Sequence, residues 1–120
     1  MLALGTNAAA TAAMLRAGAD AGATGENAIR LQCADADVIA GVAALLCANA
    51  MLGEISPGIA MAVSRSRAQK VLVPMERCGV HIVGVAPQTL DASVREAARY
   101  IAALVAPDDA AHTAPALGQE

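Results

Sequence analysis

The stretch Gly22-Ala23-Thr24-Gly25-Glu26-Asn27-Ala28 is the turn around which the rest of the chain is arranged. Its two glycines allow backbone angles that a residue with a Cβ resists. Thr24 can cap a helix that begins at Gly25, and such a cap directs free backbone N–H groups outward together with the side chains of Glu26 and Asn27. The stretch therefore predicts a binding corner made from a turn and a helix N-terminus.

An apolar run, a glycine turn and a helical segment precede this corner. Residues 1–4 are apolar and indicate the end of a buried strand, and Gly5-Thr6-Asn7 forms a turn after it. Residues 7–17 then predict a helix with Asn7 or Thr6 as its cap and Gly18 as its stop. Residues 19–25 are small and predict a loop. Strand, glycine turn and helix in this order form the basic unit of α/β proteins.

Three helices and a strand are predicted after the corner. Residues 26–33 give one or two helical turns, and residues 38–42 are apolar without alternation, which is typical of a strand buried on both faces. Residues 43–52 are ambiguous, but their alanine, leucine and methionine content favours a helix. Ser56 followed by Pro57 is a strong helix start, and the helix is expected to continue to about residue 67.

The last part of the chain predicts two strands and a long helix. Residues 71–73 form a buried strand that Pro74 stops, and residues 80–85 form the next. The short link between these strands favours an antiparallel hairpin or a bent edge strand. Asp91 is the expected cap of an amphipathic helix that ends at Pro107, with its apolar residues at helical spacing. The sequence thus predicts a single α/β domain over residues 1–106, with a mostly parallel sheet and flanking helices. The polar residues 107–120 are expected to form a disordered tail.

The composition excludes several classes of protein. The chain of 120 residues carries a formal net charge of −3, so no electrostatic argument favours binding to nucleic acid. Its longest run with no charged residue, residues 38–53, is shorter than the roughly 18–20 residues of a membrane span, so no membrane partner is expected. Three cysteines without a CxxC pair, and no basic segment of the signal-peptide kind at the start, favour a reducing cytoplasm.

Polar residues gather where ligands bind in open α/β sheets, which is beyond the carboxyl ends of strands and near helix N-termini. The candidate ligand-binding residues are Thr6, Asn7, Thr24, Gly25, Glu26, Asn27 and Asn49. Asn7 and Thr24 have the alternative role of helix caps, and Glu26 suits the dipole of a first helical turn in any case. Asn49 could equally join a buried hydrogen-bond network. Glu54 flanks the same alanine-rich segment and could point toward the rim with Asn49, but it is expected to be a solvated residue beside a turn.

Catalytic and metal chemistry find less support in the sequence. Cys78 follows Glu76 and Arg77, and an adjacent arginine could lower its pKa, but a partly buried structural cysteine is favoured because no base stands beside it. No spacing of histidine, cysteine or carboxylate residues suggests a metal site, and no catalytic residue can be named.

Five segments together resemble a small bacterial family of unknown function, over about residues 3–105 with nearly the same spacing: ALGTN (3–7), GATGENAI (22–29), DVI (37–39), ANAMLGEISP (48–57) and PMERC (74–78). Members of this family usually begin with a further strand and a glycine-rich turn of the kind D-G-Q-G-G-G-I-G, which resembles a nucleotide-phosphate loop. The resemblance implies a Rossmann-like three-layer fold that is N-terminally truncated here, since this chain starts where the second strand should end. A shortened gene model would account for that start.

Three functions follow from these observations. The first is the binding of a small polar or phosphorylated, nucleotide-like ligand at the C-terminal rim of the sheet. The resemblance implies a nucleotide for full-length relatives, in which Thr6 and Asn7 would take the position that reads the ribose; the cofactor itself is unknown. The second is a non-catalytic interaction module that associates through an open sheet edge, with a homodimer as one form. The third is an enzyme of unknown reaction that uses Glu26 or Cys78.

Overall fold

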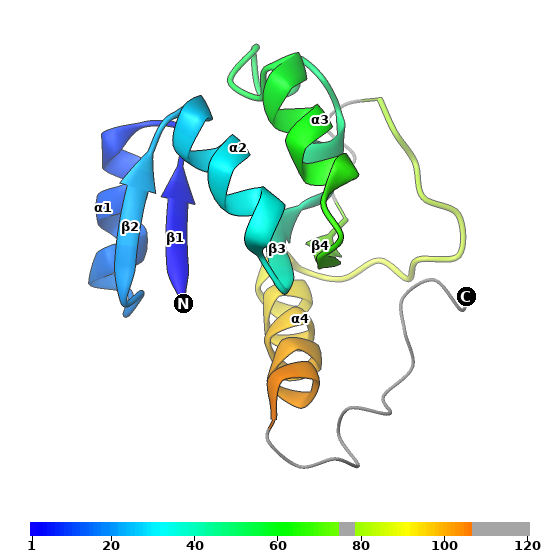
Figure 1. The fold of residues 1–120 in the computed structure, drawn as a ribbon. Coiled ribbons are helices and arrows are strands. Elements are labelled where there is room, and N and C mark those ends of the chain that lie inside the picture. The colour runs from blue at the N-terminus through cyan, green and yellow to red at the C-terminus, as the bar shows by residue number, and fades with distance from the viewer. Residues whose placement is uncertain (75–78, 107–120) are drawn as a thin grey trace.

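The computed structural model describes residues 1–74 and 79–106, in which four β-strands alternate with four α-helices and one 3-10 helix (Figure 1). In chain order they are β1 (Leu2–Gly5), α1 (Ala8–Arg16), β2 (Ala21–Thr24), α2 (Glu26–Asp35), β3 (Val38–Val42), η1 (Ala43–Leu46), α3 (Pro57–Arg65), β4 (Gln69–Val73) and α4 (Leu90–Val105). The α/β class predicted from the sequence is confirmed. The predicted tail at 107–120, the helix stop at Pro107 and Cys78 lie outside the described residues.

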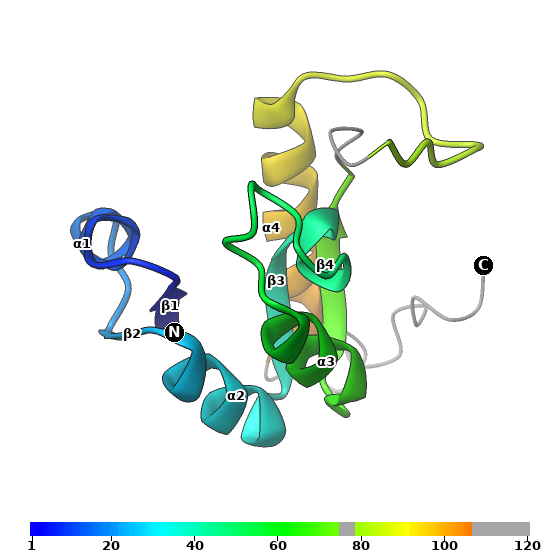
Figure 2. The same ribbon diagram turned by 90° about the horizontal axis from the view of Figure 1, so that it is seen from above.

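The four strands lie in two separate parallel pairs instead of one sheet. β1 pairs with β2 in the register that sets Gly5 beside Thr24, and β3 pairs with β4 so that Val42 lies beside Val73. The parallel direction agrees with the prediction. Figure 2 shows α3 on one side of the β3–β4 pair and α4 on the other.

Residues 19–25 were predicted as a loop, and this prediction is wrong because residues 21–24 form β2. The segment Ala-Gly-Ala-Thr lacks the β-branched and aromatic residues that favour strands. Its strand conformation depends instead on hydrogen bonds to β1, a partner that the local sequence does not reveal. The prediction of a helix over residues 43–52 is also wrong, except that residues 43–46 form the 3-10 helix η1. The chain there makes turns in which Asn49, Met51 and Leu52 have φ of 66°, 56° and 59°.

The strand and hairpin predicted at residues 80–85 are wrong as well. These residues form no strand in the structure, and the chain turns at Gly84, where φ is 90°. Val80, Ile82 and Val83 remain 43%, 38% and 87% exposed. A strand needs a neighbouring strand as well as a suitable composition, and the two described sheets, β1–β2 and β3–β4, do not include this segment.

The observed starts of the helices agree better with the predictions than the strands do. The Ser56 hydroxyl accepts a hydrogen bond from Ile59 N at 3.2 Å, and α3 begins at Pro57 as predicted, although it ends at Arg65 instead of near residue 67. In α4 the predicted cap is wrong. Thr89 accepts a hydrogen bond from Ala92 N at 3.1 Å, while Asp91 lies in the first turn.

The core lies where α2 and α3 meet. Ile29, Cys33, Ile55, Ile59 and Val63 are buried there, and each is small or aliphatic. Loop residue Ile55 is 2% exposed, so burial of its side chain anchors the turns after η1 to the core. Within the described residues, no helix has the length and apolar character needed to cross a membrane.

Candidate functional site

The two loops that follow β1 and β2 lie side by side at one edge of the first sheet. The strands are parallel with Gly5 opposite Thr24, and Gly25 N donates a hydrogen bond to Gly5 O at 2.9 Å. Thr6 and Asn7 therefore neighbour the Gly25–Glu26 turn, at the upper end of the β1–β2 pair in Figure 1. We call this edge the rim and define it by Thr6, Asn7, Gly25, Glu26 and Glu54.

Thr11 of α1 is the buried link behind the rim. It is 6% exposed, and its hydroxyl lies 2.8 Å from the Thr24 hydroxyl, with two carbonyl oxygens, Asn7 O at 3.2 Å and Ala23 O at 3.3 Å, as acceptors for its one proton. Thr24 is thus engaged with α1 and does not cap α2, so the predicted cap is wrong. The residue at the N-cap of α2 is Gly25, which has no side chain to contribute.

Asn7 has the cap role that the sequence offered as its alternative, and it also contacts Glu54. Its Oδ1 accepts a hydrogen bond from Ala10 N at 2.8 Å and caps α1, while its Nδ2 donates to Glu54 Oε1 at 2.6 Å. The Thr6 hydroxyl donates to the same Glu54 oxygen. These two hydrogen bonds, that of Thr6 first, hold the pKa of Glu54 below its ordinary value. The structure therefore brings a carboxylate to the end of β1 from a loop 48 residues away in sequence.

The contacts of Glu54 with Thr6 and Asn7 could not be predicted from the sequence. Its side chain is exposed, as expected, but it is held in place by its contacts with Thr6 and Asn7. Among the described residues, its second oxygen, Oε2, receives no hydrogen bond from the protein. That oxygen is left to accept from solvent or from a ligand.

Glu26 joins the N-termini of two helices. It lies in the first turn of α2, and its Oε1 accepts a hydrogen bond from the hydroxyl of Ser56, the cap of α3. The other carboxylate oxygen lies close to Gly58, where a Cβ would come within 2.1 Å of Oε2. Two positive helix ends thus share one half-buried carboxylate, an arrangement that the helix dipoles favour.

Asn49 and Asn27 stand apart from these contacts. Asn49 is exposed in the turns after η1, so the alternative of a buried network is wrong, and its backbone N donates to Ile55 O at 2.6 Å. Asn27 is exposed in the first turn of α2. In the described part of the chain, neither amide side chain is hydrogen bonded to a residue of the rim.

The N-terminus of α2 differs from those of the other described α-helices. Side chains of Asn7, Ser56 and Thr89 cap α1, α3 and α4, whereas the N-cap of α2 is Gly25, with φ of 104°, and provides no side-chain cap. The backbone N–H groups of the first turn of α2 are therefore left without a capping side chain. Over residues 1–74 and 79–106, no group of three or more histidine, cysteine or carboxylate side chains gathers as a metal site would require.

Comparison with known proteins relates the chain to a family. The family described as a domain of unknown function (DUF3842) matches residues 1–106 of the chain. No curated protein and no solved structure matches it.

Proposed function

The chain belongs to the family described as a domain of unknown function (DUF3842), and we propose that its rim binds a small hydroxyl-bearing or phosphorylated ligand of the nucleotide kind. The observation that carries this proposal is the position of Glu54. Its carboxylate is fixed at the end of β1 by Thr6 and Asn7, with one oxygen left to accept hydrogen bonds. The hydrogen bonds from Thr6 and Asn7 lower the pKa of Glu54 further below neutral pH, where a glutamate is ionised and accepts hydrogen bonds.

Dinucleotide-binding domains use an acidic residue in a comparable way. In such domains a carboxylate about 20 residues beyond the glycine-rich turn accepts hydrogen bonds from the ribose hydroxyls. The resemblance assigns β1 the place of the second strand in that arrangement, and the residues after β1 are Thr6 and Asn7 in place of an acid. Glu54 supplies the missing carboxylate from another loop. We infer that a vicinal diol, such as that of ribose, is the group it binds.

The charges at the rim restrict the ligand further. The first turn of α2 has no side-chain cap, and its free N–H groups suit a phosphate or hydroxyl oxygen. Two carboxylate side chains, those of Glu26 and Glu54, also belong to the rim, and an anion that approached either carboxylate to about 4 Å would be repelled by roughly 1–4 kcal/mol in polar surroundings. The rim should thus bind a nucleoside or a dinucleotide more tightly than a free phosphate ion.

Thermal unfolding of the whole chain tests the proposal. Adenosine, NAD and inorganic phosphate are added separately, and a ligand present at 100 times its Kd is expected to stabilise the fold by about 2.7 kcal/mol. We expect stabilisation by the diol-bearing compounds and a loss of at least about tenfold in affinity for Glu54→Gln. Glu96→Gln, which removes the same charge from the exposed face of α4, is the matched control and should bind as the wild type does. No stabilisation by any diol, or equal binding by both variants, would contradict the proposal.

A second candidate function is an interaction module that pairs by its sheet edges. The observation in its favour is that the four described strands form two pairs, so each strand has one edge bonded to no other strand. Such edges accept extended segments of other chains. Amide hydrogen exchange of β1 and β3 should then slow as the protein concentration rises. Exchange independent of concentration would argue against self-pairing at these edges.

A further inference from the structure

Helix α4 carries an apolar stripe that the sheet does not cover. Leu90, Val94, Ala98, Ile101 and Val105 follow one another at intervals of four, four, three and four residues. At 3.6 residues per turn these five positions fall within an arc of about 80°. Leu90, Val94 and Val105 are 59%, 49% and 61% exposed. The neighbouring arc of α4, which includes Ser93 and Ala97, is the one that lies toward the rest of the protein.

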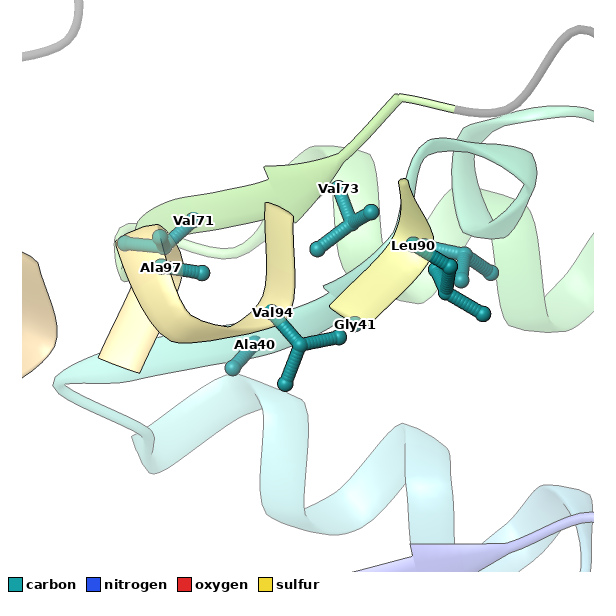
Figure 3. Close-up of a pocket in the computed structure, with 8 residues that line it drawn as sticks. Ala40, Gly41, Val71, Val73, Leu90, Val94 and Ala97 are labelled. Carbon is teal, nitrogen blue, oxygen red and sulfur yellow. The ribbon is translucent and has the colours of Figure 1, made fainter. Parts of the chain in front are cut away.

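An apolar groove continues this stripe. The groove has a volume of about 290 Å³ and lies between α4 and the β3–β4 pair (Figure 3). Its sheet side is formed by Ala40, Gly41, Val71 and Val73, and its helix side by Leu90 and Val94. The last two residues also belong to the stripe, so groove and stripe form one surface. A continuous apolar surface of this kind on a protein commonly marks an interaction site.

We propose that this surface binds the same surface of a second copy of the chain, with the two α4 helices antiparallel. The stripe is self-complementary because its spacing is nearly the same in both directions. In an antiparallel pair Leu90 lies opposite Val105 of the second copy, Val94 opposite Ile101, and Ala97 opposite Ala98. The small residues at the centre allow the helix axes to approach toward the short end of the usual 8–10 Å range. A twofold axis relates the two copies, as in most homodimers.

The charges beside the stripe do not oppose this association. Asp91 and Arg95 flank it, and they form an ion pair within the helix, with 2.8 Å between Arg95 Nη2 and Asp91 Oδ2. A second copy therefore meets no unbalanced charge. Glu96 and Arg99 lie outside the arc of the stripe. With two acidic and two basic residues, the polar part of α4 also lacks the excess of Lys and Arg typical of helices that bind membrane surfaces.

The size of the surface predicts a weak dimer. A helix of 16 residues is about 24 Å long and about 10 Å wide. Even with the groove, this face is smaller than the roughly 800 Å² per partner of a standard stable interface. The dimer should therefore dissociate on dilution, with a Kd on the order of micromolar or weaker.

Analytical ultracentrifugation of the whole chain over a roughly hundredfold range of concentration tests the proposal. We expect the mass to rise toward that of a dimer, and Val94→Glu to weaken association at least about tenfold. Arg99→Glu, on another face of α4, is the matched control and should associate as the wild type does. Circular dichroism checks that both variants remain folded; should Val94→Glu unfold, Val105→Glu replaces it, because that side chain is 61% exposed.

A cross-link distinguishes this surface from the sheet edges. Ala98→Cys, near the proposed twofold axis, should form a covalent dimer on mild oxidation when Cys47 and Cys78 are replaced by serine, whereas Glu96→Cys in the same background should not. Three results would overturn the proposal: a monomer at every concentration, a dimer that tolerates both Val94→Glu and Val105→Glu, or equal cross-linking by Ala98→Cys and Glu96→Cys. So would binding to anionic vesicles of phosphatidylserine and phosphatidylcholine without self-association.

Discussion

Replacing Gly5 by alanine tests the contact that sets Thr6 and Asn7 at the rim. A Cβ on Gly5 would lie 2.2 Å from Thr11 Oγ1, 2.7 Å from Thr11 N and 2.9 Å from Asn7 O. Rotation of the Thr11 side chain can relieve the first contact but not the other two, which are to backbone atoms. To reach an ordinary separation of 3.4 Å from Thr11 N, the first turn of α1 must move from β1 by about 0.7 Å.

The free-energy cost of Gly5→Ala has two sources, the crowding itself and the hydrogen bond that is broken when α1 moves. Insertion of a methyl group into a closely packed site costs about 1–3 kcal/mol. The Thr11 hydroxyl would also leave its partner Thr24, 2.8 Å away, and one such hydrogen bond contributes about 1 kcal/mol. We therefore expect Gly5→Ala to lower the free energy of unfolding by about 3 kcal/mol, or the melting temperature by roughly 10–20 °C.

Gly22→Ala is the matched control, because Gly22 lies on the neighbouring strand against the same helix. Its Cβ would meet side-chain atoms only, Thr11 Cγ2 at 2.8 Å and Leu15 Cδ1 at 3.1 Å. Leu15 is 41% exposed and can move, whereas buried Thr11 must shift by about 0.6 Å to reach 3.4 Å, so we expect a cost of about 1 kcal/mol, well below that of Gly5→Ala. Urea unfolding of both variants measures the difference. Equal effects, or a neutral Gly5→Ala, would refute the reasoning that close approach of α1 to β1 fixes the rim.

Three further predictions concern single side chains. Since Glu54 has a folded-state pKa below 4.5, its contribution to stability should be present above pH 4.5 and disappear as the pH falls through the folded value. Urea midpoints should therefore drop with acid less steeply in Glu54→Gln than in the wild type, and parallel curves would contradict this. Gly58→Ala should stabilise α3 by up to about 1 kcal/mol in a Glu26→Ala background and by less in the wild type, because there the new methyl group must displace the Glu26 carboxylate. Additive effects in a double-mutant cycle would exclude that contact. Burial raises the pKa of the Cys33 thiol, so a thiol reagent should label half-buried Cys47 in the native protein and Cys33 only on unfolding, as read by mass spectrometry of the peptides. Labelling at equal rates would contradict the burial.

Sequence signals succeeded where structure depends on residues close together in the chain. The strand predicted at residues 38–42 matches β3, and the hydroxyl cap of Ser56 with Pro57 correctly starts α3. Asn7 was correctly named as a cap of α1. Each of these features is set by a short apolar run or by a hydrogen bond that spans three residues.

Strand pairing could not be predicted in the same way. The small residues of β2 have little preference for a strand, yet they pair with β1 along its whole length. Residues 80–85 have the composition of a strand and form none. In both segments the outcome depends on whether a neighbouring edge is present, and this is a property of the fold and not of the segment.

The turns after η1 also depend on contacts between distant parts of the chain, and they bear on the proposed function. Met51 and Leu52 adopt left-handed backbone angles, which cost a residue with a Cβ roughly 1–2 kcal/mol each, and Leu52 is fully exposed and gains no burial in return. Strain of this kind persists only where the surroundings enforce it, and it is concentrated at functional sites. Here burial of Ile55 holds one end of the turns, and the hydrogen bonds of Glu54 to Thr6 and Asn7 hold the same end to the rim. A ligand that binds to Glu54 would add to the forces that hold this strained loop, so binding at the rim and ordering of the loop should be thermodynamically coupled.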